Sequence, residues 1–282
     1  MKIPALLLIG ATIASAQFRA GVSLVRVDAE VVDANGHIVE GLKKDDFRVL
    51  DEGMPQTLVS FNFAEDPLDL ILLFDVSGGM KNKILSIVRA TELGFNELRH
   101  GDRVSVRAFS TYSSEYLPFN DDMQEVNVAI LTRVLSMGFG GGSKFEPAAD
   151  EAALRFRQEG KTKRKRAVLA ITGKPGAREP NEDGIVRDFW GSDAVLSELL
   201  LGPTGMNAVV DKTGGITIAT TGIPGDAFRD SVHYLRSGYA MYYAQPEAGA
   251  GTLRRVEVQL TDDAARRFPG VSVHARAGYV TP

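Results

Sequence analysis

The sequence predicts an α/β protein: a three-layer, doubly wound and mainly parallel sheet, inserted into a small β-sandwich that both chain ends form. In the 282-residue chain, apolar and polar residues alternate as in half-buried strands near both ends. Between these parts, nearly continuous apolar runs alternate with helical patterns, which is typical of a parallel sheet covered by helices. Neither terminal group of strands can bury its apolar face alone, so we expect the two groups to pair.

The first half of the sandwich is expected over residues 22–63. Apolar residues occupy every second position in 25–31 (VRVDAEV), and Asn35-Gly36 supplies a turn that accepts positive φ. The second half is expected over 238–282, where strand patterns lie at 238–244, 254–260 and 271–280.

The α/β domain is expected over residues 66–237. Its first strand is the apolar run 68–76 (LDLILLFDV), which reads as a strand covered on both faces. Further strands are expected at 104–109, 167–172 and within 193–201, and helices at 84–98, 125–137, 146–159 and around 228–235. Gly101 is expected to cap the first of these helices.

The N-terminus predicts export. Lys2 precedes a short apolar run, and Ala14-Ser15-Ala16 fits a peptidase site, so residues 1–16 are expected to be a signal peptide. The alternative is a buried N-terminal strand or helix. No later run approaches the 18 or so apolar residues that a membrane span needs. The destination, periplasm or medium, stays open.

Composition excludes several function classes. The 36 acidic and 32 basic residues give a charge of −4, which argues against a nucleic-acid partner. The absence of cysteine excludes disulfides, thiolate zinc sites and cysteine nucleophiles. The four histidines are scattered without an i, i+4 pair, and neither G-x-S-x-G nor H-E-x-x-H occurs, so no enzyme is expected.

Three loops carry the residues most suited to a binding site. Asp75-Val76-Ser77-Gly78-Gly79 follows a buried strand, Gly140-Gly141-Gly142-Ser143 precedes a helix, and Thr172-Gly173 ends another strand. Because the carboxyl ends of parallel strands share one sheet edge, these residues are expected to meet in space.

At this point the chain resembles a known family. LLFDVSGGM, GDRVSVRAF, GGGSKF and AVLAITGK, in this order, look like a von Willebrand factor type A domain. The flanks, among them VVDANGHIVEGLKKDDFRVLDEG and VSVHARAGYVTP, resemble exported proteins of the acidobacterial type that carry this domain. The resemblance implies a metal-ion-dependent adhesion site built from D-x-S-x-S, a threonine in the glycine loop and the aspartate of a T-D-G turn.

The chain departs from that pattern at two positions. Asp75 and Ser77 match, and Ser143 keeps a hydroxyl where the family has threonine. Gly79 replaces the second serine and Gly173 replaces the aspartate. Asp75, Ser77 and Ser143 offer one negative charge, so at most weak Mg²⁺ or Mn²⁺ binding is expected at this degenerate site, and no other cofactor.

Two alternatives to a weak metal site stay open. Glu146 or Asp150 could complete the ligand set, or Asp75 and Ser77 could simply cap the following helix. The double substitution Gly79→Ser and Gly173→Asp is expected to rebuild the oxygen set without touching the core.

Three further features are assigned structural roles. The basic run 161–166 (KTKRKR) is interpreted as a solvated loop rather than an acidic-surface or nucleic-acid site. Glu179, Glu182, Asp183 and Asp188 are interpreted as a surface connection, and Trp190 as core rather than an exposed anchor for a partner.

The sequence therefore predicts an exported, non-enzymatic module of unknown oligomeric state that binds a protein or peptide. The alternatives are an envelope scaffold that binds through its β-sandwich and, more distantly, a hydrolase. The partner-binding residues are expected at the strand ends: Asp75, Ser77, Gly78, Gly79, Gly142, Ser143 and Gly173.

Overall fold

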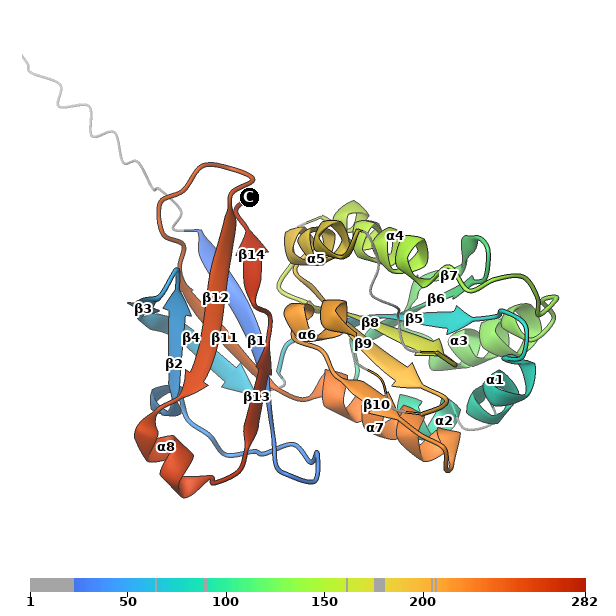
Figure 1. The fold of residues 1–282 in the computed structure, drawn as a ribbon, viewed down its shortest axis with the longest axis horizontal. Coiled ribbons are helices and arrows are strands. Elements are labelled where there is room, and N and C mark those ends of the chain that lie inside the picture. The colour runs from blue at the N-terminus through green and yellow to red at the C-terminus, as the bar shows by residue number, and fades with distance from the viewer. Residues whose placement is uncertain are drawn as a thin grey trace, which may run out of the picture.

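The computed structural model describes residues 23–282 except 64, 89, 90, 161, 175–180, 204 and 206. Two lobes lie side by side, a β-sandwich and an α/β lobe (Figure 1). The expected signal peptide at 1–16 lies outside the described residues. None of the helices in the described part of the chain combines the length and apolar character that spanning a bilayer requires.

The α/β lobe is built on a six-stranded sheet in the order β10-β9-β8-β5-β6-β7. All neighbouring strands run parallel except the edge pair β6 and β7, which is antiparallel. Every residue of the central strand β5 is buried, which explains its continuous apolar run. The strands are β5 (Leu68–Asp75), β6 (Arg103–Phe109), β7 (Ser113–Asn120), β8 (Lys165–Thr172), β9 (Ala194–Leu200) and β10 (Thr217–Ala219).

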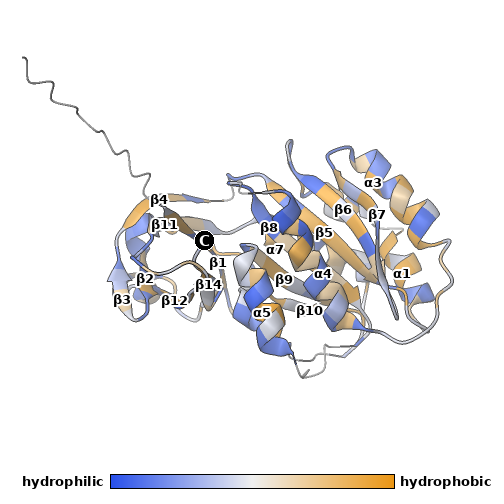
Figure 2. Cartoon of the chain, turned by 90° about the horizontal axis from the view of Figure 1, so that it is seen from above, coloured by the Kyte–Doolittle hydropathy of each residue, from blue (hydrophilic) through white to orange (hydrophobic). Residues whose placement is uncertain are grey.

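Helices cover both faces of this sheet. Alternate residues of β5 enter two separate cores: Leu70 and Leu72 pack with α1, α2, α3 and α7, whereas Ile71 and Leu73 pack with α4, α5 and α6. Figure 2 shows the central strands as hydrophobic and the helices as polar on their outer sides. The helices are α1 (Lys81–Val88), α2 (Thr91–Phe95), α3 (Met123–Ala129), α4 (Phe145–Gln158), α5 (Glu182–Gly191), α6 (Ala208–Thr213) and α7 (Pro224–Arg236).

The sandwich takes strands from both chain ends into each of its sheets. One sheet has the order β13-β1-β11-β4 and the other β14-β12-β2-β3. In the first, β1 lies between β11 and β13, with Val27 opposite Met241 and Val31 opposite Val273. The strands are β1 (Leu24–Val32), β2 (Phe47–Asp51), β3 (Met54–Gln56), β4 (Leu58–Phe63), β11 (Tyr239–Ala244), β12 (Leu253–Leu260), β13 (Ser272–Ala275) and β14 (Gly278–Val280). The predicted fold class is thereby confirmed.

Two ion pairs join the lobes, and the first of them is buried. Lys165, at the start of β8, donates from Nζ to Glu30 of β1 at 2.5 Å and to the carbonyl of Ser237 at 2.9 Å. Arg276 of the sandwich pairs with Asp193 of the α/β lobe at 2.7 Å. β1 and the residues between β13 and β14 are therefore fixed to the α/β lobe.

Several local predictions need correction. The helix expected over 125–137 is present, but it consists of α3 followed by a π-helical turn at Ile130–Val134 and ends three residues earlier. Gly101 caps no helix, because α2 ends at Phe95. Of the acidic segment interpreted as a connection, Glu182, Asp183 and Asp188 belong to α5, and Glu179 lies outside the described residues. Strands β7 and β10 and the short helix α8 (Asp262–Arg267) carried no recognised signal.

Candidate functional site

The strand-end face lies at the far end of the α/β lobe from the sandwich, where β5 and β8 end (Figure 1). β5 ends at Asp75 and β8 at Thr172, and the glycine loop approaches both before α4 begins. Two backbone hydrogen bonds fix this loop: Gly140 N donates to Val76 O at 3.1 Å, and Lys144 N donates to Ser110 O at 2.8 Å.

Asp75 organises the face. Its side chain is buried, with the residue 2% exposed, and Oδ1 accepts from the backbone N–H of Ser77 at 2.8 Å. Oδ2 accepts from Ser143 Oγ at 3.0 Å and from Thr172 Oγ1 at 2.8 Å. The structure thus brings Asp75, Ser77 and Ser143 together, in an arrangement where hydrogen bonds from all three loops converge on one carboxylate.

Sequence reasoning placed Thr172 in one of the three converging loops but did not name it among the site residues. Its hydroxyl lies at the C-terminal end of β8 and bonds directly to Asp75. The available signal was its place in Thr172-Gly173, which aligns with the threonine of the family's T-D-G turn.

The two glycines at which the chain departs from the resembled pattern lie in different local environments. Gly79 has φ +87°, and no atom would lie within 4 Å of an added Cβ. Glycine is therefore favoured at this position by its backbone conformation and not by a lack of space. At Gly173, an added Cβ would lie 2.6 Å from Met80 Sδ and 3.3 Å from Lys83 Nζ. Met80 is only 4% exposed and belongs to the core of the lobe.

These two environments correct the expectation that a serine at 79 and an aspartate at 173 would leave the core untouched. A serine at 79 must adopt a left-handed backbone, and a side chain at 173 must displace Met80. The ammonium group of Lys83 also lies close to Gly173, held by a hydrogen bond from Nζ to Leu201 O at 2.6 Å.

The residues present do not fit a divalent metal. Asp75 supplies one carboxylate, whose oxygens already accept three hydrogen bonds, and an ammonium group lies where the family has a second carboxylate. Asp150 faces α5 instead, where burial and a hydrogen bond with Asp188 raise its pKa to about 6. Within the described residues, no group of three or more His, Asp or Glu side chains is placed to hold a metal ion.

With this geometry established, the comparisons with known proteins become informative. Residues 70–176 match the von Willebrand factor type A domain family. The matched segment runs from β5 through the glycine loop and β8, so it contains Asp75, Ser77, Ser143 and Thr172. No curated protein is similar enough to the chain to count as a relative.

The solved structure of a von Willebrand factor type A protein supports the type A fold, and two further solved structures are similar to the chain. The von Willebrand factor type A protein from Catenulispora acidiphila is 12% identical, with a TM-score of 0.51, and the match covers 94% of this chain and 75% of that one. Proximal thread matrix protein 1 from the mussel byssus is 10% identical, with a TM-score of 0.50, covering 64% of this chain and 50% of that one. An aerotolerance-related membrane protein from Bacteroides fragilis is 16% identical, with a TM-score of 0.46, covering 58% of this chain and 98% of that one. At these identities the likeness concerns the fold alone.

An exposed aromatic side chain beside the type A strand ends was also missed. Tyr112 follows β6 and is 85% exposed, the most exposed of the large hydrophobic side chains described. Its carbonyl accepts from Ser110 N at 3.0 Å, and Ser110 in turn holds the glycine loop through Lys144. Tyr112 therefore stands at the rim of the strand-end face.

The basic run is a solvated loop only in its first part. Thr162 and Lys163 are exposed and precede β8, whereas Lys165 and Arg166 are buried, and Arg164 donates from Nε to Asp69 at 2.5 Å. The preceding glycine and the run of charged residues suggested a loop. The structure instead begins β8 at Lys165, and this first residue of the strand faces the sandwich. Lys161 lies outside the described residues.

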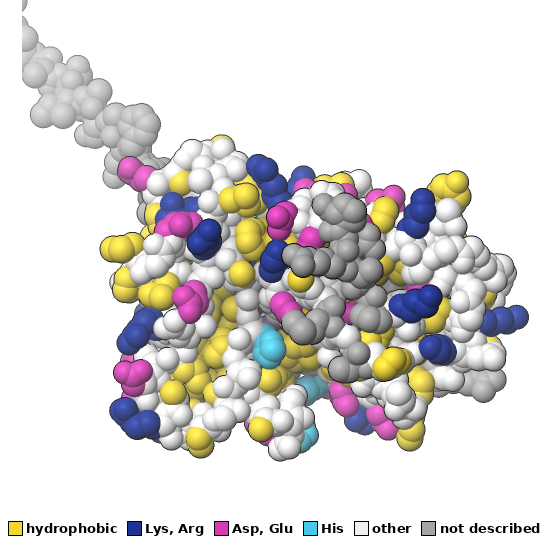
Figure 3. Space-filling view, viewed as in Figure 1, with side chains coloured by type: hydrophobic (Ala, Val, Ile, Leu, Met, Phe, Trp, Pro, Cys, Tyr) yellow, Lys and Arg dark blue, Asp and Glu magenta, His cyan; other side chains and the backbone are white. Residues whose placement is uncertain are grey.

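Trp190 and the histidines also have defined places. Trp190, in the last turn of α5, is partly buried against the core on this side of the sheet and donates from Nε1 to Lys212 O at 3.0 Å. His37, His233 and His274, although scattered in sequence, line one cavity of about 790 Å³ at the junction of the lobes, where Figure 3 shows histidine side chains beside apolar ones. Burial lowers the pKa of His274.

Proposed function

We propose that this protein is an exported, non-enzymatic module that binds another protein or a peptide at its strand-end face. The observation that carries the proposal is the convergence of Ser77, Ser143 and Thr172 on Asp75, next to exposed Tyr112. A rigid polar site beside an exposed aromatic side chain has the composition of a protein-binding hot spot. The type A match supports the same reading, because domains of this family commonly mediate protein interactions.

Charge favours an acidic segment in the partner. Lys144 and Lys174 directly follow Ser143 and Gly173, and Lys83 lies against Gly173. Figure 3 shows Lys and Arg side chains at the end of the molecule away from the sandwich. Complementary charge would steer association and set the register of the bound segment.

In this proposal the partner binds without a bridging metal ion. Where the resembled family places a cation, this chain places an internally hydrogen-bonded carboxylate and the ammonium group of Lys83. Binding should therefore persist in the presence of a chelator.

The experiment is a pull-down from envelope extracts of the organism that makes the protein. The variant Tyr112→Ala combined with Ser143→Ala should lose the partner, because both changes remove contacts at exposed positions of the face. A control that combines Met54→Ser with Val59→Thr on the sandwich should retain it. Equal retention by both variants would count against the strand-end face.

A second candidate is a scaffold that binds through its sandwich. Met54 of β3 and Val59 of β4 are 66% and 55% exposed, on strands at the edges of the two sheets. Exposed apolar side chains on edge strands are sites for pairing with another chain. Loss of the partner only in the Met54→Ser and Val59→Thr variant would favour this function.

Export itself stays a proposal, based on Lys2 and the Ala14-Ser15-Ala16 pattern. N-terminal sequencing of the mature protein should give Gln17 as the first residue. Recovery of an intact N-terminus at Met1 in the cell interior would contradict it.

A further inference from the structure

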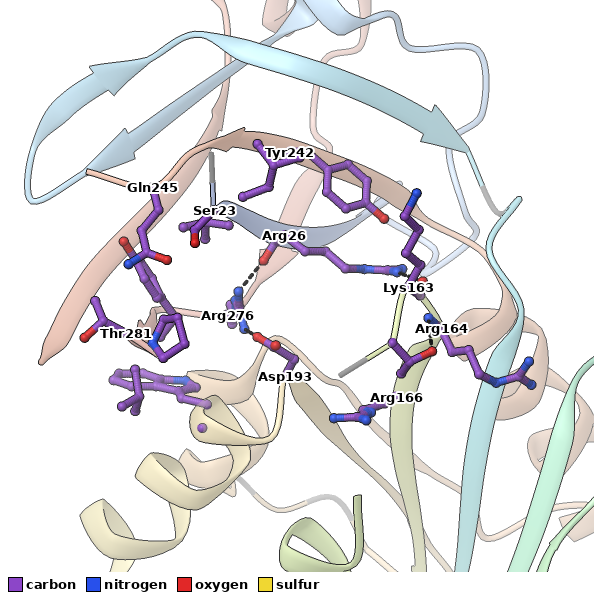
Figure 4. A pocket seen from close by; sticks show the side chains of 18 of the residues that line it. Ser23, Arg26, Lys163, Arg164, Arg166, Asp193, Tyr242, Gln245, Arg276 and Thr281 are labelled. Carbon is purple, nitrogen blue, oxygen red and sulfur yellow. Dashed lines mark hydrogen bonds and ion pairs between the residues drawn. The ribbon is translucent and has the colours of Figure 1, made fainter. Parts of the chain in front are cut away.

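A second candidate site lies between the lobes, on the opposite end of the α/β lobe from the strand-end face. It is a cavity of about 580 Å³ that lies between the start of β1, the end of β11, β14 and the loop before β8. Figure 4 shows Arg26, Arg276 and Arg166 arranged around this hollow, together with Lys163 and Asp193. Its walls therefore come from both lobes.

Arg166 is a buried cation on the α/β side of the cavity. The residue is 6% exposed, its Nη1 donates to Ser192 O at 3.0 Å, and its Nη2 donates to Gly160 O. Its Nε has no acceptor, and no carboxylate forms an ion pair with it among the described residues. Its guanidinium also lies over the ring of Phe156, 5.7 Å from the centroid. A buried guanidinium whose hydrogen bonds go only to carbonyls keeps a charge that no carboxylate at hydrogen-bond distance offsets. Burial lowers the pKa of this group.

Arg276, on the sandwich side of the cavity, also has one guanidinium N–H without an acceptor in the described part of the chain. The residue is 7% exposed, its Nη1 donates to Asp193 Oδ1 at 2.7 Å, and its Nη2 donates to the carbonyl of Arg26. Its Nε likewise has no acceptor among the described residues. Two of the residues that line this cavity thus each hold a buried Nε–H donor without a described acceptor, which native structures rarely leave unexplained.

The charge balance of the cavity is positive. Asp193 is the acidic side chain among the described lining residues, and Arg276 already engages it. Arg26 is neutralised by Asp28 and Asp66, at 2.8 Å and 3.1 Å. Lys163 is exposed and has no ion pair within the described part of the chain. Arg166 and Lys163 therefore leave an excess of positive charge.

We infer that this interlobe cavity binds a small organic anion that carries carboxylate or phosphate groups. Oxygen atoms of such groups are the acceptors that guanidinium N–H donors match best. The volume lies within the range of small-ligand pockets and exceeds what a single inorganic ion fills. Trp190, Tyr242 and Tyr279 line the same cavity and offer surface for the carbon skeleton.

Such a ligand would bridge the lobes. Arg166 and Lys163 belong to the α/β lobe, whereas Arg276 belongs to the sandwich. An anion held between them would stabilise the native arrangement, because a ligand bound only by the folded state raises its stability. The inference does not depend on the partner proposed at the strand-end face.

The chain offers its own reporter for the test. Trp190 is the only tryptophan, and it lines the cavity. Tryptophan fluorescence and thermal unfolding would be followed while citrate, pyrophosphate or inorganic phosphate is added, with sodium chloride at equal ionic strength as the reference. We expect a saturable fluorescence change and a rise in Tm with citrate, pyrophosphate or both. A response to citrate indicates a carboxylate ligand, and a response to pyrophosphate indicates a phosphate ligand.

The variants locate the response. Arg166→Gln should weaken binding roughly tenfold or more, the cost of losing a charge-assisted hydrogen bond. Lys163→Gln, at an exposed position, should leave folding intact and weaken binding a few-fold. Arg266→Gln on α8, also exposed and outside the cavity, should bind like the parent. If the anions change fluorescence and Tm no more than sodium chloride does, the inference is wrong. Unchanged affinity in both Arg166→Gln and Lys163→Gln would also overturn it. If Arg166→Gln does not fold, the affinity of Lys163→Gln alone decides.

Discussion

Asp75 shows how one residue fixes the geometry of the strand-end face. Its two carboxylate oxygens accept three hydrogen bonds, from Ser77 N, Ser143 Oγ and Thr172 Oγ1. Asp75→Ala would leave these donors without their acceptor in a buried place, so we expect a loss of about 1–3 kcal/mol in the free energy of unfolding. Urea denaturation would measure it. Ser143→Ala, at an exposed position, should cost far less, and an equal cost for both would contradict this account.

The adjacent glycines 78 and 79 give a matched pair for backbone strain. Gly79 has φ +87°, whereas Gly78 lies outside the left-handed region, and both have open space. Gly79→Ala should destabilise the protein by about 1 kcal/mol, because a Cβ is disfavoured at positive φ. Gly78→Ala should be neutral or slightly stabilising. Thermal unfolding of the two variants would check this; the same Tm for both would count against it.

Metal dependence is the third prediction at the scale of residues. Millimolar Mg²⁺ or Mn²⁺ should leave the Tm of the parent nearly unchanged, since Asp75 supplies a single carboxylate. The Gly79→Ser and Gly173→Asp variant should be less stable than the parent without metal, because Met80 must move. Micromolar affinity of the parent in titration calorimetry would contradict the first expectation.

Sequence reasoning at this scale reached the residues but not their contacts. The positions of Asp75, Ser77 and Ser143 followed from strand ends and glycine loops. The packing of Met80 and Lys83 against Gly173 depends on how α1 lies across the end of β8, which no local pattern encodes. For the same reason, the burial of Arg166 could not be recognised within a basic run.

At the scale of elements, Asp51 ties together four strands of the sandwich. It is fully buried at the end of β2 and accepts from Tyr243 Oη of β11 and Tyr279 Oη of β14, each at 2.9 Å. Arg254 of β12 donates to it from Nε at 2.8 Å. Burial and the hydrogen bond to Asp51 raise the pKa of Tyr279 to about 12.

Asp51→Ala should therefore destabilise the sandwich by about 3–5 kcal/mol, the usual cost of removing one partner from a buried ion pair. Chemical denaturation would measure the loss. Asp263→Ala, on the exposed surface of α8, should change stability by less than about 0.5 kcal/mol. A loss below about 1 kcal/mol for Asp51→Ala would mean that the strands are held by apolar packing alone.

Elements were predictable where their periodicity was strong. The buried strands β5, β8 and β9 and the helices α4 and α7 stand out by apolar runs or helical spacing. β7 was missed because its exposed edge position leaves a weak pattern, with no residue of the strand fully buried. The charges at the start of α5 concealed the apolar face formed by Ile185, Val186 and Phe189.

At the scale of the whole molecule, the pair of Glu30 and Lys165 couples the lobes to pH. Burial, opposed by the ammonium group of Lys165, raises the pKa of Glu30 to about 7, from an ordinary value of 4.5. Between these two values the folded state binds a proton that the unfolded state releases. The contribution of Glu30 to stability is therefore present at low pH and falls as pH rises toward 7.

Glu30→Gln should remove this dependence. The free energy of unfolding of the variant, relative to that of the parent, should rise by a few kcal/mol between about pH 5 and about pH 8. Asp28, Lys165 and Tyr234 face the same group and are unchanged in the variant. Denaturation curves at several pH values would test it, and a difference that stays constant across this range would contradict the coupling.

The central claim, that the strand-end face binds a protein partner without metal, is tested most directly by site-specific photocrosslinking. A photoreactive amino acid would replace Tyr112 in one protein and Val59 in another, and both would be irradiated in envelope extracts with EDTA or with Mg²⁺. The account predicts one crosslinked partner at position 112 under both conditions, reduced by Ser143→Ala. Crosslinks only at position 59, or at position 112 only with Mg²⁺, would contradict it.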